Sequence, residues 1–113
     1  MLHAFSRSEE LLGKEGLKRL SEAKIAVFGI GGVGSYVVEA LARSGVGSLT
    51  LVDHDVVSLT NLNRQLIALR STIGRKKVLV AKERIMDINQ DAVVHTYDTF
   101  FGAETVDLFD FSA

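Results

Sequence analysis

The segment that decides the fold runs from Val27 to Ser35 and reads VFGIGGVGS. Within it, Gly29, Gly31 and Gly34 form the pattern G-x-G-x-x-G, which joins a buried strand to a helix in dinucleotide-binding proteins. The first glycine permits a tight turn, the second lets a phosphate approach the backbone, and the third allows close packing of helix on strand. The helix N-terminus then offers free N–H groups to an anion. The segment therefore predicts a phosphate-binding turn, and the alternative is a glycine turn that holds no ligand.

The sequence on either side of this turn alternates between helical and strand patterns. Short apolar runs predict buried parallel strands at residues 24–28, 48–52 and 93–97. Helical periodicity predicts helices over residues 33–44 and 74–89, and a short helix over 103–109. Residues 8–20 predict a short helix or two helical turns, interrupted by Gly13 and Gly16, and Gly45 is the expected C-cap of the helix over 33–44. The expected inner faces of the two long helices are Val33, Val37, Val38, Leu41 and Ala42 in one, and Val78, Ala81, Ile85 and Ile88 in the other.

This order of elements predicts an α/β fold with a Rossmann-like, doubly wound parallel sheet, preceded by a short helical segment. Strand–helix–strand units of this kind have right-handed crossovers. A doubly wound sheet continues for at least two more strands, so we expect residues 1–113 to be only the N-terminal part of such a domain, with a truncated end.

The composition excludes several classes of function. The chain has no cysteine, which removes disulfides, thiolate zinc sites and cysteine nucleophiles and favours a cytoplasmic protein. A formal net charge of −1 provides no general attraction to nucleic acid. The apolar runs are too short to span a membrane, and the first residues lack the layout of a signal peptide.

Polar residues follow the second predicted strand and precede the next helix. Asp53 lies 19 residues after Gly34, where a carboxylate binds ribose hydroxyls in this type of fold. Beyond it come Asn61, Asn63, Arg64 and Gln65, and then the basic triplet Arg75, Lys76 and Lys77. NAD carries only a pyrophosphate, whereas a triphosphate needs more cations to neutralise it. The cations therefore favour ATP, although Arg64 pairing with a surface acid and a solvated basic helix face are the alternatives.

The same residues resemble the ubiquitin-activating-enzyme-like adenylating enzymes, a family that includes the ThiF and MoeB sulfur-carrier activators. The resemblance covers nearly the whole chain and rests on GIGGVGS, on the stretch DHDVVSLTNLNRQ at 53–65, and on Lys77, 13 residues after Arg64. It implies that ATP and Mg²⁺ are used to adenylate a carboxylate, with Asp53 at the ribose and with Arg64 and Lys77 as catalytic residues at the phosphates. The implied nucleotide-binding residues are Gly29, Gly31, Gly32, Gly34, Asp53, Asp55, Asn61, Asn63, Arg64, Gln65 and Lys77.

The resemblance also implies that the complete site needs residues from a partner subunit and from beyond residue 113. In family dimers an N-terminal arginine enters the partner's ATP site, and the segment FSRSE makes Arg7 the candidate in a homodimer; an ordinary surface arginine is the alternative. The family's Mg²⁺-binding aspartate and substrate-binding half are expected beyond residue 113. We therefore expect an N-terminal part of one ATP-binding adenylation domain, incomplete for catalysis and with no metal ligands of its own.

Within the family, the opening FSRSEELLG and the stretch GIGGVGSYVVEALARSGVG are most similar to bacterial tRNA threonylcarbamoyladenosine dehydratases. This similarity implies that tRNA is the partner and that its threonyl carboxylate is activated and cyclised. Three alternatives remain: adenylation of the C-terminal glycine of a ubiquitin-like sulfur carrier, an NAD(P)-dependent oxidoreductase, and a non-catalytic nucleotide-binding module.

Overall fold

The computed structural model describes residues 5–99, without the side chains of residues 6–8. The elements follow one another as α1 (Ser6–Glu22), β1 (Lys24–Phe28), α2 (Gly32–Arg43), β2 (Ser48–Val52), α3 (Lys77–Ile88) and β3 (Val93–Tyr97). Two short 3₁₀ helices, η1 (Leu59–Asn61) and η2 (Arg70–Thr72), lie in the long connection between β2 and α3. The predicted helix over 103–109 lies outside the described residues.

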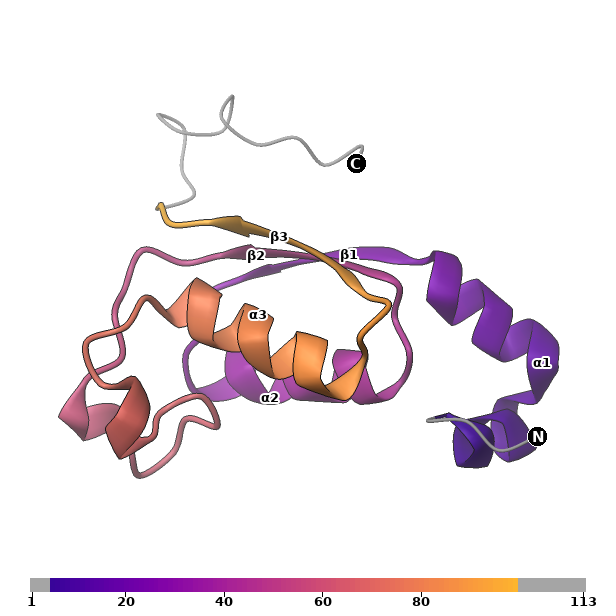
Figure 1. Cartoon of the computed structure of the whole chain (residues 1–113), viewed down its shortest axis with the longest axis horizontal. Coiled ribbons are helices and arrows are strands. Elements are labelled where there is room, and N and C mark those ends of the chain that lie inside the picture. Colours follow the sequence, from indigo (N-terminus) through magenta and orange to yellow (C-terminus); the bar gives the residue numbers. More distant parts are fainter. Residues whose placement is uncertain (1–4, 100–113) are drawn as a thin grey trace.

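The three strands form one parallel sheet in the order β1-β2-β3. Lys24 is level with Ser48 and Val93, and Phe28 is level with Val52 and Tyr97, so the carboxyl ends of all three strands lie at one edge. Helices α2 and α3 lie side by side on the same face of the sheet, and α1 extends away from its end (Figure 1). This arrangement confirms the predicted Rossmann-like α/β fold and corresponds to one half of a doubly wound sheet.

The core lies between the sheet and these two helices. Four of the five residues of β2 are buried and none is exposed, as expected for the central strand of a parallel sheet. The largest fully buried apolar side chains are Ile30, Val46, Leu49, Leu51, Val57, Val78 and Ile85. No helix within residues 5–99 is both long enough and apolar enough to cross a membrane.

Helix α2 ends as predicted, but its inner face is narrower than the sequence indicated. Gly45, at φ +88°, allows its own N–H to bond Ala42 and that of Val46 to bond Leu41, which closes the helix. Val33 is 80% exposed and Val37 is also exposed, whereas Val38 and Ala42 are buried. The prediction for Val33 and Val37 was wrong because only one face of α2 meets the sheet and α3.

Two predicted helix boundaries also differ. Helix α1 is longer than expected. It is kinked at Gly13, which has φ +75°, so the predicted interruption at that glycine is confirmed, whereas Gly16 lies within the helix. Helix α3 begins at Lys77 rather than Gly74. Lys76 is extended and forms an antiparallel bridge with Val56, so residues 74–76 are held by the preceding loop and not by the helix.

Candidate nucleotide-binding site

The glycine-rich turn connects β1 to α2 as the sequence predicts. Gly29 has φ +87°, a conformation that side chains disfavour, and its N–H donates to the carbonyl of Val52. A Cβ at Gly34 would lie 1.9 Å from the carbonyl oxygen of Gly29, so the close approach of helix and strand requires a glycine there. Helix α2 begins at Gly32, immediately after the turn. Its unpaired N–H groups therefore face the carboxyl edge of the sheet.

Asp53 ties this turn to the end of β2. One carboxylate oxygen accepts from the backbone N–H of Ile30 at 2.6 Å, and the other accepts from that of Asp55 at 2.7 Å. The side chain is buried, with 8% exposure. A carboxylate has about four acceptor positions, so two remain for ribose hydroxyls. Asp53 can therefore hold the turn and bind a sugar at the same time.

The structure separates the three members of the basic triplet. Arg75 pairs with Glu83 at 2.7 Å and holds the pKa of that carboxyl below its usual value, and Lys76 pairs with Asp98 at 2.7 Å. Both cations are exposed, so for them the solvated-face interpretation is correct. Lys77 is only 5% exposed, and its ammonium lies 3.9 Å from a carboxylate oxygen of Asp55. It is the member of the triplet that faces the site.

These groups line a pocket of about 430 Å³ at the carboxyl edge of the sheet. Of the predicted residues, Gly29, Gly31, Asp53, Asp55 and Lys77 line it. Sequence reasoning missed Phe28, Val52, His54 and Thr99, which also line it. The signal for these residues was their position, because each ends a parallel strand or lies two residues after one, at the edge where ligands bind in open α/β sheets.

The predicted residues of the long loop are not among the residues that line the pocket. Asn61 is buried and its side-chain oxygen accepts from the N–H of Ser58, which shapes η1. Arg64 donates to the carbonyl of Thr60 and to the side-chain oxygen of Asn63, both at 3.0 Å. Within residues 5–99 it forms no ion pair with an acid, so the predicted alternative for Arg64 is not observed. Its contact with the phosphates stays a prediction, as do those of Asn61 and Asn63.

Gln65 and Gly32 contribute to the turn in different ways. The side chain of Gln65 is buried, and its amide nitrogen lies 3.8 Å from the position a Cβ would take on Gly31. Nothing lies within 4 Å of a Cβ placed on Gly32, which leaves room in front of the helix N-terminus. Arg7 belongs to the first turn of α1, and its side chain lies outside the described part of the chain.

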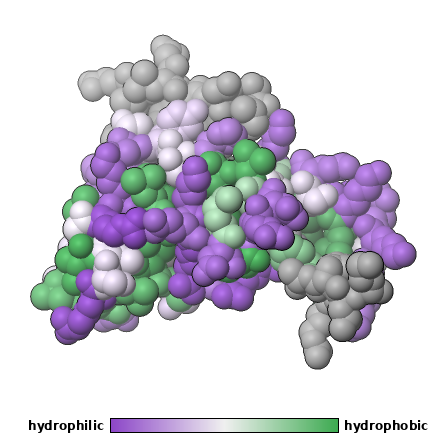
Figure 2. Space-filling model, viewed as in Figure 1, coloured by the Kyte–Doolittle hydropathy of each residue, from purple (hydrophilic) through white to green (hydrophobic). Residues whose placement is uncertain are grey.

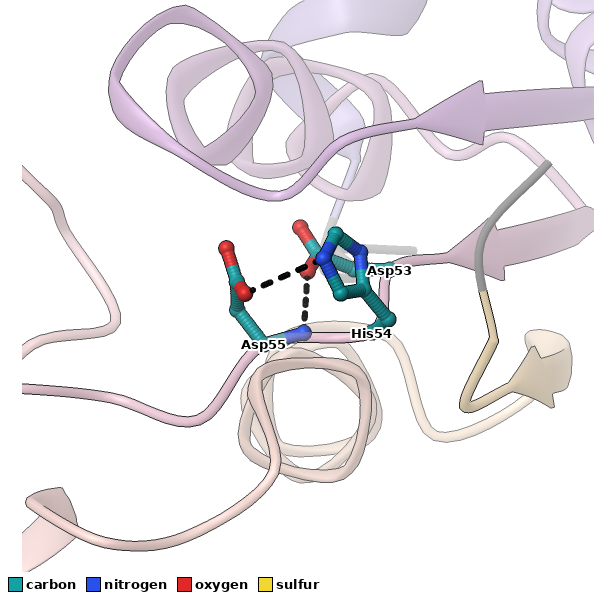
Figure 3. Close-up of side chains that lie close together, drawn as sticks. All are labelled: Asp53, His54 and Asp55. Atoms are coloured by element: carbon teal, nitrogen blue, oxygen red, sulfur yellow. Dashed lines mark hydrogen bonds and ion pairs between the residues drawn. The ribbon is translucent and has the colours of Figure 1, made fainter. Parts of the chain in front are cut away.

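Asp53, His54 and Asp55 form a small cluster whose candidate ligand atoms lie within 4.8 Å of one another (Figure 3). His54 approaches Asp55 at 3.4 Å, and both oxygens of Asp53 already accept backbone hydrogen bonds. Mg²⁺ demands an octahedral set of oxygen ligands, which this trio does not supply without phosphate oxygens and water. Asp55 is the member that could add one such oxygen beside a bound nucleotide.

The fold and this pocket together define an α/β protein of the Rossmann type with a pocket beside its glycine-rich turn. Residues 5–111 match the ThiF family, and the chain belongs to that family. The chain is 54% identical over 109 residues to a tRNA threonylcarbamoyladenosine dehydratase of Bacillus subtilis, covering 96% of this chain and 43% of the relative.

Two further comparisons place the chain within the family. The crystal structure of the Escherichia coli tRNA N6-threonylcarbamoyladenosine dehydratase in complex with ATP matches with a TM-score of 0.90 and 44% identity, over 93% of this chain and 43% of that one. A molybdopterin-synthase adenylyltransferase of Salmonella typhimurium is 43% identical over 75 residues, which are 66% of this chain and 30% of that protein. The chain thus spans less than half the length of these relatives.

Proposed function

We propose that this chain is the ATP-binding part of an enzyme that adenylates the threonyl carboxylate of tRNA threonylcarbamoyladenosine and leads to its cyclic, dehydrated form. The observation that carries the proposal is the pocket formed by the glycine-rich turn, Asp53 and the buried Lys77. The high identity with relatives named as dehydratases of this nucleoside supports the choice of substrate.

The reaction needs positioned charge more than a covalent catalyst. A carboxylate oxygen attacks the α-phosphorus of ATP, the bond to the bridging oxygen breaks, and pyrophosphate leaves. An atom of the same threonylcarbamoyl group then attacks the activated carbonyl carbon, which closes the ring, displaces AMP and releases the proton of the attacking group, so the nucleoside loses the elements of water overall. The N–H groups of α2 and the ammonium of Lys77 would stabilise the phosphate charge, and Asp53 would hold the ribose.

Arg64 would have to change its contacts to take part. Its present hydrogen bonds, to Thr60 and Asn63, lie within its own exposed loop and bring no buried charge into play. A triphosphate at the turn would offer it a charge-assisted bond, which is stronger than either neutral one. Mg²⁺, when bound, would neutralise further phosphate charge, with Asp55 as the candidate ligand from the described residues.

The preference for ATP or NAD distinguishes the proposed adenylation from the hypothesis of an NAD(P)-dependent oxidoreductase. ATP with Mg²⁺ should raise the melting temperature of the protein more than NAD does at equal concentration, because Lys77 faces charge that only the triphosphate carries. A preference for NAD would contradict adenylation. Binding of ATP without any substrate-dependent exchange of pyrophosphate would favour a non-catalytic nucleotide-binding module.

Adenylation of a ubiquitin-like sulfur carrier is the second candidate, supported by the similarity to the Salmonella adenylyltransferase. The two candidates differ in the carboxylate that triggers exchange of labelled pyrophosphate into ATP. We expect exchange with tRNA that carries threonylcarbamoyladenosine and none with a sulfur carrier. A tRNA substrate would place the protein in the cytoplasm.

We also propose a homodimer in which each ATP site receives Arg7 from the partner. The exposed leucines of α1 support a partner on this element, since Leu11 is 88% exposed and α1 makes few contacts with the sheet. Figure 2 shows further hydrophobic surface among hydrophilic residues on the same molecule. Sedimentation should give a dimer, and mixing Arg7→Ala with Lys77→Ala chains should restore exchange, because each mixed dimer keeps one intact site.

A further inference from the structure

Helix α1 consists of two helical segments that meet at an angle at Gly13 (Figure 1). Gly13 has φ +75° and ψ 168°, a backbone conformation that essentially only glycine adopts. At Gly16 a Cβ would lie 2.9 Å from the Cβ of Leu12, whereas Cβ atoms four residues apart in a regular helix are about 5–6 Å apart. The kink therefore depends on glycine at both positions, and a straight helix needs neither.

The segment after the kink, residues 14–22, is attached to the sheet. The carbonyl of Leu20 accepts from the N–H of Gly47, and that of Ala23 accepts from the N–H of Ser48, both at 3.1 Å. The side chain of Leu20 packs against the core. These contacts fix the helix directly before β1, so a movement about Gly13 would carry only the residues that precede it.

We call residues 5–12, before the kink, the N-terminal arm. Ring atoms of Phe5 lie 3.6 Å from the position that a Cβ would take on Gly45, so the arm folds back onto the amino edge of the sheet. Phe5 is only half-buried and lines three hollows of about 440, 600 and 560 Å³, which leave space around its ring. Leu11 is 88% exposed and Leu12 is 53% exposed. The arm therefore buries little apolar surface in this position.

We propose that the N-terminal arm has two positions, with Gly13 as the hinge and Phe5 as the latch. The closed position is the one in this structure, with Phe5 over Gly45. In the open position Gly13 is helical, α1 is continuous, and Phe5 has left Gly45. Opening loses the small contact of Phe5, but it lets N–H groups after Gly13 bond the carbonyls four residues before them. Because the gain offsets the loss, a single substitution can shift the populations of the two positions.

The N-terminal arm includes Arg7, whose backbone belongs to the first turn of α1. The hinge therefore sets how far Arg7 can move from its own chain. In the proposed homodimer, the open position would extend the reach of Arg7 towards the partner. This consequence rests on the proposed function, whereas the hinge itself does not.

The test uses Phe5→Trp, which gives the chain its one tryptophan and makes its fluorescence a probe of the latch. Adding Gly13→Ala should shift the ratio of open to closed chains about tenfold, because alanine is strained in the kink and favoured in a helix. Adding Gly16→Ala should shift it in the same direction, since the new Cβ conflicts with Leu12 only in the kink. Both changes should raise the quenching of the tryptophan by acrylamide and shift its emission to longer wavelength.

Gly74→Ala is the matched control, because Gly74 also has a positive φ, +87°, and open space around its Cβ position, but lies outside α1. It should lower the melting temperature and leave quenching at the level of the Phe5→Trp parent. Quenching that stays at the parent level in the Gly13→Ala or Gly16→Ala protein overturns the hinge, and so does a failure of either protein to fold. The measurement needs no nucleotide. A wild type that binds no ATP would therefore contradict the proposed function, and the quenching result would still decide the hinge.

Discussion

Lys77 shows how differently three consecutive cations can behave. Arg75 and Lys76 are exposed and paired with acids, whereas the ammonium of Lys77 is buried in the pocket wall. Burial weakens solvent screening, so a charge there interacts more strongly with a phosphate than an exposed charge does. The neighbouring lysine provides a control of the same residue type.

Lys77→Met should raise the dissociation constant for ATP at least about tenfold, because it removes a charge-assisted contact. Lys76→Met should change it less than about twofold, since its partner Asp98 leaves it outside the pocket lining. Isothermal titration of ATP into both variants checks this, with circular dichroism to confirm folding. Equal losses in the two variants would contradict the assignment of Lys77.

The glycines of the turn differ just as sharply in what they tolerate. Gly34→Ala should lower the free energy of unfolding by about 2 kcal/mol or more, because its Cβ would meet backbone that cannot move aside. Gly32→Ala should leave it unchanged or raise it by about 0.5–1 kcal/mol, since the new Cβ meets nothing and alanine favours a helix. Urea unfolding of the two variants measures this difference. Equal destabilisation would mean that helix and strand are not in contact through Gly34.

At the scale of elements, α2 and α3 are joined by an ionic cluster on their outer faces. Glu39 of α2 accepts from Arg84 of α3 at 2.5 Å and from Arg43 of its own helix at 2.7 Å. The hydrogen bond from Arg84 is the main cause that lowers the pKa of Glu39 to about 2, from 4.5. Since both helices begin at the pocket, this cluster helps to keep their N-terminal ends aligned.

The folded-state pKa of Glu39 lies below its unfolded value, so its contribution to stability is present above pH 4.5 and is lost as the pH falls towards 2. Glu39→Gln should therefore lower the free energy of unfolding by about 2 kcal/mol at pH 7. The difference from the wild type should narrow below pH 4.5. Urea unfolding across this pH range tests it, and a difference that persists unchanged to pH 3 would exclude the ion pair as its cause.

At the scale of the whole molecule, the carboxyl ends and the amino ends of the three strands differ in what surrounds them. The carboxyl edge carries the turn, Asp53 and Lys77, whereas the amino edge carries the tight connections through Gly45 and Gly47. At Gly47 a Cβ would lie 1.8 Å from the carbonyl of Ser21, so this edge is closed by the end of α1. A bound nucleotide should therefore change the dynamics of the backbone at the carboxyl edge only.

Hydrogen exchange should show this asymmetry. ATP should slow exchange in residues 28–35, 53–57 and 74–78, because these segments surround the pocket, and should leave residues 44–48 and 89–92 unchanged. Exchange followed by mass spectrometry with and without ATP measures both sets. Protection at the amino edge, without protection of the glycine-rich turn, would move the nucleotide site elsewhere.

Local sequence determined the parallel α/β order, the glycine-rich turn, the place of Asp53 and the C-cap at Gly45. These features depend on neighbouring residues, because a turn glycine or a short apolar run specifies its local structure through residues only a few positions away. Five of the predicted binding residues accordingly line the observed pocket.

Only the tertiary structure decided which of several similar residues face the site. In the structure Val33 and Val37 are exposed, and α3 begins at Lys77. Lys77 is buried, whereas Arg75 and Lys76 are exposed. The tertiary structure also left the buried side-chain oxygen of Gln65 without a hydrogen-bond partner and placed the amide nitrogen of that residue 3.8 Å from the Cβ position of Gly31. Burial and partners arise from segments far apart in the chain, and a pattern of neighbouring residues contains no information on which of those segments will meet.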